Sequence, residues 1–166
     1  MLGGAAALTL LLTAAAPVPE PDPAGELRRA VHADVFAGGD GLSHLPVELA
    51  GQLGPLQALR ESRPFGRPAP ELLTAAPEGT RALRGTGTLL VLAPAGEPFG
   101  LDTAVLPGPR LQGWWYDPRT GTPIDLGTVP RGAGVAFHPP ATGPQDAGRD
   151  WVLVVDSLPL GPPGST

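Results

Sequence analysis

The chain has 166 residues, of which 24 are Gly and 23 are Pro, and it carries a formal net charge of −5 and no Cys. This length fits about one domain, and a hydrophobic content of 42% indicates a folded core with many turns rather than a disordered chain. The absence of Cys excludes disulfides and thiolate metal sites, and the acidic balance argues against nucleic-acid binding, which needs a basic face.

The first 25 residues combine an apolar stretch with a proline-rich linker at 17–23. Residues 5–12 have the length of the apolar region of a signal peptide, and small residues follow at 13–16. No basic residue precedes this stretch, and Pro17 disfavours cleavage after Ala16. Two interpretations therefore stay open: a secretion signal, which would place the protein outside the cytoplasm, or a buried segment of a larger domain, which leaves a cytoplasmic location open. The stretch is too short to span a bilayer comfortably.

A helical segment is expected within residues 26–76. From Glu26 onward, apolar residues at 27, 30, 31 and 35 keep one helical face, and the Gly-rich stretch 38–41 ends the helix. A second helix is expected over 47–62, which Gly54 and Pro55 should kink or split and which Arg63 should end. Its amphipathic stripe is made by Leu49, Leu53, Leu56 and Leu59. Because such a stripe rarely stays open, we expect it to pack on the rest of the chain or to drive self-association.

From about Ala82 the pattern changes to short apolar runs separated by turn residues. The expected strands cover residues 87–94, 99–106, 110–116, 122–126, 133–138 and 150–156. Six short strands at this spacing predict a mainly β fold, a small antiparallel β-sandwich over residues 77–158. The last residues, 159–166, are expected to form a disordered tail.

A hairpin turn is expected after the aromatic run of the third of these strands. Asp117 can accept a hydrogen bond from the backbone two residues on, and Pro118 presets φ for the first turn position. Gly121 tolerates positive φ because it has no Cβ. We therefore assign Asp117, Pro118 and Gly121 to a structural turn.

The aromatic run itself has two interpretations. Adjacent strand residues point to opposite faces, so Trp114 and Tyr116 share one face and Trp115 takes the other, with Trp151 and Phe137 in the core. In the first interpretation all of these rings fill the sandwich. In the second, Trp114 and Tyr116 form an exposed platform for sugar rings or Pro-rich chains, with Asp117 and Arg119 at its rim. The candidate binding residues are accordingly Trp114, Tyr116 and Arg119.

No catalytic residue, metal site or cofactor is expected. Glycoside hydrolysis needs two carboxyl groups about 5–10 Å apart, and no rigid scaffold fixes such a pair in the helical part. The histidines are too dispersed for a metal site, with His32 expected on a helix surface and His138 at a strand end. Asp146 and Asp150 in one loop offer too few oxygen ligands for Ca²⁺.

Three segments in the same order and spacing carry a family resemblance. They are WYDPRTG at 115–121, FHPP at 137–140 and DWVLVVD at 150–156, and the strand at 89–94 and the leucines before ESRPF at 61–65 add to them. With these segments, residues from about Arg28 to Asp156 resemble the C-terminal end of the apiosidase-like glycoside hydrolases. Those bacterial proteins are built from a (β/α)8 barrel followed by a β-domain labelled as collagen-binding.

The resemblance implies a β-domain preceded by a two-helix remnant of the barrel, because only the last part of a barrel fits before Gly85. The acidic Glu-Pro signature of the barrel is echoed only at Glu20 and Pro21, inside the linker. The implied function is a non-catalytic accessory domain for structural support or for binding a polysaccharide or extracellular matrix polymer, either carbohydrate or collagen-like. An alternative is a fragment of a split or truncated glycoside hydrolase that is active only with a missing catalytic barrel. A decayed gene product without activity is the third interpretation.

Overall fold

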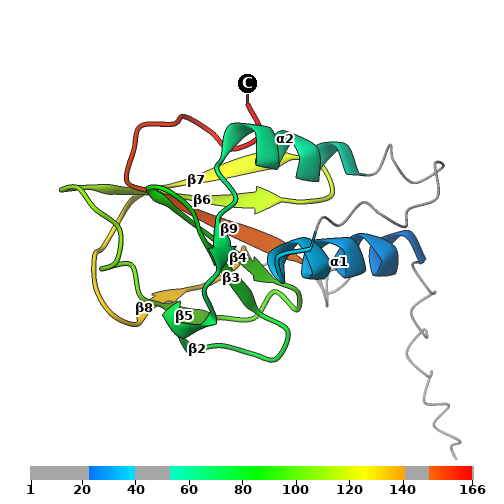
Figure 1. The fold of residues 1–166 in the computed structure, drawn as a ribbon, viewed down its shortest axis with the longest axis horizontal. Helices are drawn as coiled ribbons and strands as arrows, with labels where there is room; N and C mark the ends of the chain where they lie inside the picture. The colour runs from blue at the N-terminus through cyan, green and yellow to red at the C-terminus, as the bar shows by residue number, and fades with distance from the viewer. Residues whose placement is uncertain (1–22, 40–52, 141–149, 166) are drawn as a thin grey trace, which may run out of the picture.

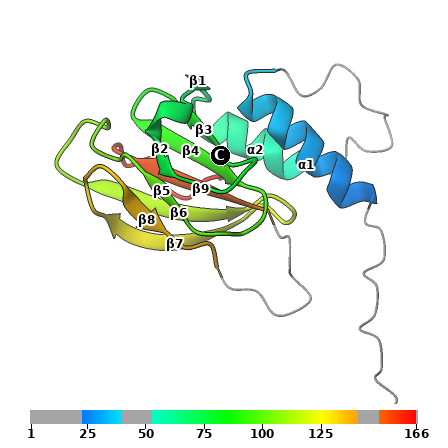
Figure 2. The same ribbon diagram turned by 90° about the horizontal axis from the view of Figure 1, so that it is seen from below.

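The computed structural model describes residues 23–39, 53–140 and 150–165, and the predictions for residues 1–22, including the apolar run and the linker, lie outside this part. The described residues form three layers: two helices, a six-stranded antiparallel sheet and a three-stranded antiparallel sheet (Figures 1 and 2). The predicted fold class, a mainly β sandwich preceded by two helices, is confirmed. In the described ranges no helix is long and apolar enough to cross a membrane.

The helices begin and end close to where the sequence predicts. Helix α1 spans Pro23–Phe36 and is followed by Gly38 at φ +94°. Helix α2 spans Gly54–Ser62, so Pro55 sits in its first turn, where proline is tolerated, and a helix start at Gly54 agrees with the expected split rather than with a kink. Residues 47–52 of the predicted helix lie outside the described residues. The N–H of Arg63 closes α2 by donating to the carbonyl of Leu59.

The larger sheet has the strand order β1-β3-β4-β9-β6-β7. Its strands are β1 Arg67–Pro68, β3 Arg81–Arg84, β4 Thr88–Ala93, β9 Trp151–Asp156, β6 Leu111–Asp117 and β7 Thr122–Val129. The smaller sheet has the order β2-β5-β8, from Leu73–Ala75, Phe99–Leu101 and Val135–Phe137, and a 3-10 helix at Pro70–Leu72 precedes it.

All six predicted strands are present, and three of them differ clearly in length. Strand β8 covers only Val135–Phe137 of the expected 133–138. Strand β5 ends at Leu101 because Asp102 starts a turn, in which its carboxylate accepts the N–H of Ala104 at 2.9 Å. Strand β7 continues to Val129, beyond the expected end at residue 126. Strands β1, β2 and β3 are not predicted from the sequence; all three are short, and only β3 has buried residues.

Strands β4 and β9 lie in the middle of the large sheet, and both of their faces are buried. Their side chains alternate between two hydrophobic cores. Leu89, Val91 and Leu153 belong to the core between the sheets, and Leu90 and Val154 belong to the core beneath the helices. This double burial explains why both strands read as continuous apolar runs in the sequence.

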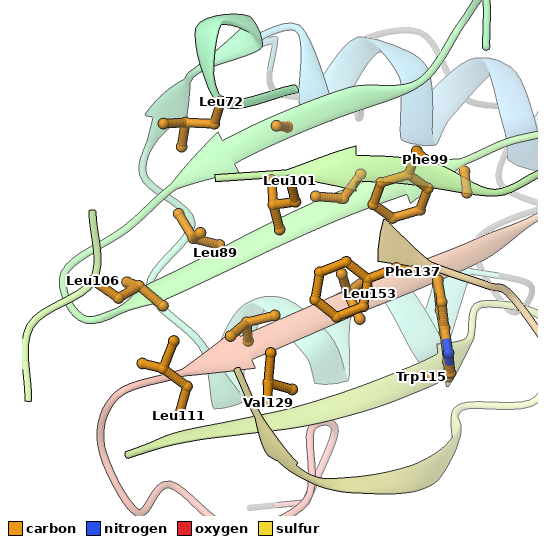
Figure 3. Packing of buried hydrophobic residues seen from close by; sticks show 14 of the residues in the cluster. Leu72, Leu89, Phe99, Leu101, Leu106, Leu111, Trp115, Val129, Phe137 and Leu153 are labelled. Atoms are coloured by element: carbon orange, nitrogen blue, oxygen red, sulfur yellow. The ribbon is translucent and has the colours of Figure 1, made fainter. Parts of the chain in front are cut away.

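The first core fills the space between the two sheets (Figure 3). The ring of Trp115 meets those of Phe99 and Trp151 edge-on, with centroids 6.1 and 6.4 Å apart, and Phe99 stacks on Phe137 at 6.0 Å. The predicted placement of Trp115, Trp151 and Phe137 in the core is confirmed. Such pairs add about 0.5–1.5 kcal/mol each beyond the area they bury.

The second core lies between the other face of the large sheet and the two helices. The leucine stripe of α2 supplies Leu56 and Leu59, and α1 supplies Val31, Val35 and Phe36. These side chains cover the buried face of β4, β6 and β9. The stripe therefore packs on the β-domain, which is one of the two outcomes expected from the sequence.

Residues 157–165, here called the C-terminal strap, follow β9 and return to helix α2 (Figure 1). Pro163 is buried, and the N–H of Gly164 donates to the Ser62 hydroxyl at 2.8 Å. The Arg63 guanidinium donates to the carbonyl of Gly161. The predicted disordered tail is therefore wrong for residues 159–165, because side chains of distant residues satisfy the backbone groups of the strap.

Candidate functional site

The turn between β6 and β7 forms as a hydrogen-bonded loop. The Asp117 carboxylate accepts the N–H of Arg119 at 2.9 Å, and the Asp117 carbonyl accepts the N–H of Gly121 at 2.8 Å. Gly121 has φ +73°, and Pro118 follows Asp117 as a first turn residue should. The turn fixes the register of the β6–β7 hairpin, in which Asp117 faces Thr122.

Tyr116 is fully buried in the second core, at 0% exposure, so the idea that it forms an exposed platform with Trp114 is wrong. The helices cover this face of the sheet, and the Tyr116 hydroxyl donates to the carbonyl of Pro55 at 2.6 Å. Burial, with a smaller contribution from the charge of Asp117, raises the pKa of Tyr116 to about 12. The side chain therefore holds the start of α2 on the sheet.

Arg119 does not join Trp114 either. Its guanidinium forms a bidentate pair with the Asp117 carboxylate, with both N–O distances at 2.7 Å. The same group lies 5.8 Å from the centroid of the Trp151 ring, in the range of a cation–π contact. Arg119 thus belongs with the aromatic cluster of the first core.

Trp114 remains half-buried and lines an open groove of about 670 Å³. Strands β6 and β7 supply one side of the groove and the C-terminal strap supplies the other. The lining residues from the strands and the loop before them are Pro109, Arg110, Leu111, Gln112, Trp114, Asp125 and Thr128, and those from the end of β9 and the strap are Asp156, Ser157, Leu158, Pro159 and Gly161.

Several hydrogen-bonding groups of this groove are free to meet a ligand. In the described part of the chain, the side chains of Arg110 and Thr128 are exposed and have no partner. The indole N–H of Trp114 also has no partner, but it is buried and does not reach the groove surface. The Asp125 carboxylate is held in place, because one oxygen accepts from the Gln112 amide at 2.5 Å and from the N–H of Gly127 at 2.6 Å. The second carboxylate oxygen of Asp125 has no such contact within the described residues. An aromatic side chain surrounded by fixed and free polar groups is a typical composition of a small-ligand site.

The carboxylates of Asp150 and Asp156, at opposite ends of β9, are buried and bound to arginines. Asp150 is paired with Arg28 of α1 at 2.9 Å, and Asp156 with Arg63 at 2.9 Å. Burial alone would raise the pKa of Asp150, but the nearby His32 side chain, together with the hydrogen bonds and charge of Arg28, outweighs it and holds this pKa well below its usual range. Burial raises the pKa of Asp156, although a hydrogen bond from Thr88 at 2.6 Å and the Arg63 guanidinium oppose it.

His32 was expected on a helix surface, and this prediction is wrong. Its side chain is 1% exposed and its Nδ1 lies 3.7 Å from the Asp150 carboxylate. His32 follows Val31 on the side of α1 that faces the sheet, so the apolar stripe and the histidine are buried together. His138 lies just after β8 and is exposed, as expected of a residue at a strand end.

Asp150 and Asp156 do not form with each other the acid pair that glycoside hydrolysis needs. Asp150 precedes β9 and Asp156 ends it, which separates them by about 20 Å at the rise of a strand. The reaction needs carboxyl groups about 5–10 Å apart. Throughout the described ranges, no three His, Asp or Glu side chains gather closely enough to hold a metal ion.

Comparisons with known proteins agree with this architecture. Residues 72–156 match the family described as "Putative collagen-binding domain of a collagenase". A solved structure named "Glycoside hydrolase" matches with a TM-score of 0.68 at 22% identity, covering 81% of this chain and 37% of that one. A glycoside hydrolase family 5 protein from Bacteroides vulgatus ATCC 8482 matches with a TM-score of 0.66 at 22% identity, covering 81% of this chain and 36% of that one.

These matches differ in extent. The structural similarity reaches beyond the family segment at 72–156, since it covers 81% of the chain. The chain in turn spans just over a third of the length of the two hydrolase structures. A comparison with curated proteins gives no match.

Proposed function

Because the chain belongs to the family of collagen-binding domains that matches residues 72–156, we propose that it is a non-catalytic accessory module that binds an extracellular polymer. The polymer that the groove fits best is a carbohydrate chain, bound beside Trp114. The proposal places the module outside the cytoplasm, in the company of a carbohydrate-active protein. The two structural neighbours are named as glycoside hydrolases, and the module would correspond to the part of them that it resembles.

The observation that carries this proposal is the composition of the groove. The flat ring of Trp114 offers an apolar surface, and Arg110, Gln112, Asp125 and Thr128 offer donors and acceptors around it. Sugar rings need this combination, since they present C–H groups on a ring face and hydroxyl groups at its edge. A collagen-like polypeptide would use the ring but would leave most of the carboxylate, amide and hydroxyl groups without a partner.

The non-catalytic role is supported by the state of the buried acids. Asp117, Asp150 and Asp156 each form an ion pair with an arginine, at N–O distances of 2.7 to 2.9 Å. A general acid or a nucleophile of a glycosidase must instead face the substrate. The three carboxylates therefore serve the fold, and the groove has only Asp125 as an exposed acid.

The experiment that tests the proposal is binding of the Trp114→Ala variant to immobilised plant and bacterial polysaccharides and to collagen and gelatin. We expect the unchanged protein to be retarded by a polysaccharide, and the variant to lose at least about tenfold in affinity, or about 1.4 kcal/mol. Because Trp114 is half-buried, the melting temperature is measured alongside. The control is His138→Ala, an exposed change outside the groove.

Each outcome has a distinct meaning. Retention on gelatin or collagen without retention on any polysaccharide would replace the carbohydrate by a polypeptide ligand. Binding to a polysaccharide that Trp114→Ala leaves unchanged would move the site away from the groove. A variant that unfolds would assign Trp114 to the core, and Trp114→Phe, which keeps an aromatic ring, then tests the groove.

A second candidate function, a fragment of a split glycoside hydrolase, is favoured by one observation. The structural match includes more than the family segment yet spans only 36–37% of the hydrolase chains. This candidate requires a surface for a catalytic barrel, whereas the outward residues of the helices include the exposed and polar Glu26, Gln57 and Glu61. The genomic sequence upstream decides the matter, because an in-frame barrel there would favour the fragment.

A further inference from the structure

We propose that the C-terminal strap is the second wall of the ligand groove and that Leu158 is its ligand-contacting residue. This inference rests on the proposed function, in which Trp114 binds a carbohydrate chain. It extends the site to a segment beyond residues 72–156, where the family match ends. The site would therefore combine a strand of the sheet with the end of the chain.

The strap is held in a fixed position at both of its ends. At its start, the N–H of Ser157 donates to the carbonyl of Gly87 at 2.8 Å, and the Ser157 hydroxyl donates to the same carbonyl at 3.0 Å. Near its end, Arg63 binds the carbonyl of Gly161, and Ser62 accepts the N–H of Gly164. The residues between these anchors are thereby held beside the sheet and can act as a wall.

Arg63 links this wall to the sheet. Its guanidinium binds Asp156 at the end of β9 with Nε at 2.9 Å, and it binds Gly161 in the strap through Nη2. Both of these partners line the groove. Since the Arg63 side chain is itself buried, it sets the position of the wall without being needed as a contact for the ligand.

Two leucines of the strap differ in their relation to the groove. Leu158 is 47% exposed and lines the groove, whereas Leu160 is 40% exposed and does not line it. Leu158 is backed by Gly87, where an added Cβ would lie 3.2 Å from a Leu158 methyl group. Leu158 on one wall of the groove and Trp114 on the other would contact the apolar faces of a bound carbohydrate chain. Leu158 is suited to this because it is exposed to the groove and rests against Gly87 on its other side.

Leu158→Ala and Leu160→Ala form a matched pair for the test, because they make the same change in the same segment at similar exposure. We expect Leu158→Ala to lower the affinity for the retained polysaccharide about fivefold to tenfold and Leu160→Ala to leave it unchanged. Both changes should leave the melting temperature close to that of the unchanged protein, since surface substitutions have small effects on stability.

A second measurement tests the wall without any ligand. Trp115 and Trp151 are buried, so the tryptophan fluorescence that acrylamide quenches should come mainly from Trp114. We expect Leu158→Ala to increase this quenching and Leu160→Ala to leave it unchanged, and Trp114→Phe should remove the quenched component. If no polysaccharide binds but the quenching changes as expected, the proposed function is wrong, whereas the position of Leu158 as a wall of the groove beside Trp114 is supported. Equal quenching and equal affinity in the two leucine variants would overturn the inference.

Discussion

The carboxyl group of Asp150 connects two layers of the molecule through a single charge. It accepts two hydrogen bonds from Arg28, at 2.9 and 3.3 Å, and thereby ties helix α1 to the start of β9. The side chain of Asp150 is almost completely buried, and that of Arg28 is mostly so. Removing one partner of such a pair leaves a charge that is buried without compensation, which is the costly way to break it.

We predict that Asp150→Asn lowers the stability at neutral pH by about 3 kcal/mol, measured by urea unfolding. The pKa of Asp150 is lower in the folded protein than the value of about 3.9 in an unfolded chain. A depressed folded pKa contributes stability above the unfolded pKa, and this contribution is lost as the pH falls through the folded pKa. The difference between the variant and the unchanged protein should therefore shrink below pH about 4.

The stability contribution of Asp156 should depend on pH in the opposite way to that of Asp150. Its pKa is raised in the folded state, so the folded protein binds this proton more tightly than the unfolded chain does. Its contribution has the opposite sign: it is present below the unfolded pKa and lost as the pH rises through the folded pKa.

A stability difference for Asp150→Asn that stays constant between pH 7 and pH 3 would contradict the role assigned to Asp150.

At the scale of single elements, helix α2 acts as a cover for the large sheet. It is only nine residues long, and helices of this length are marginal in isolation, so its stability comes from the packing of Leu56 and Leu59. The hydrogen bond from Tyr116 to Pro55 fixes one end of α2, and the contacts of Ser62 and Arg63 fix the other. The helix therefore depends on the sheet as much as the sheet depends on the helix.

We predict that Leu59→Ala costs about 2–5 kcal/mol of unfolding free energy, because it removes a side chain that is 1% exposed and leaves a cavity. The measurement is urea unfolding followed by tryptophan fluorescence. The control in the same helix is Gln57→Ala, which removes only an exposed hydrogen bond to Glu61 and should change the stability by less than about 0.5 kcal/mol. Similar losses for both variants would mean that α2 is not packed as described.

The sequence predicts a helix, strand or turn well where its residue pattern follows from a single local property, such as burial of both faces or the preferences of turn residues. Strands β4 and β9 are continuous apolar runs because both of their faces are buried, and the β6–β7 turn follows from Asp117 and Gly121. Strand β3 was missed because Arg81 and Arg84 flank only two apolar residues, and its place in the sheet is set by its pairing with β4. Pairing with another strand decides such short strands, and local propensity does not.

The candidate site shows the same limit. Alternation correctly separates Trp115 from Trp114 and Tyr116, but the exposure of the latter two depends on which part of that face the helices cover. Tyr116 lies beneath α2, whereas Trp114 is left at the edge of the groove. The strap was beyond prediction because its anchors, Ser62 and Arg63, lie about a hundred residues away in the sequence.

At the scale of the whole molecule, the six-stranded sheet contributes one face to each of the two hydrophobic cores. Leu89 and Leu90 are neighbours in β4, yet one belongs to the core between the sheets and the other to the core beneath the helices. Loss of either core exposes one face of the same strands. The layers should therefore not unfold separately.

We predict a single cooperative transition in calorimetry, with a calorimetric enthalpy equal to the van't Hoff enthalpy. Leu59→Ala in one core and Phe99→Ala in the other should each shift this transition to lower temperature without splitting it. A helical signal that melts before the near-ultraviolet signal of Trp115 and Trp151 would show that the helices form a separate unit, as a loosely attached remnant of another domain would.

The strap also restricts which substitutions are tolerated. Gly164 has φ +79° and lies so close to the Tyr116 ring that an added Cβ would be 2.9 Å from a ring carbon, so a side chain at this position meets steric constraints. A truncation just after Asp156 would keep every described strand and still remove the strap groups that bind Ser62 and Arg63, although Arg63 would keep its pair with Asp156. The strap is thus part of the folded unit, because it is bound to helix α2 and to the sheet.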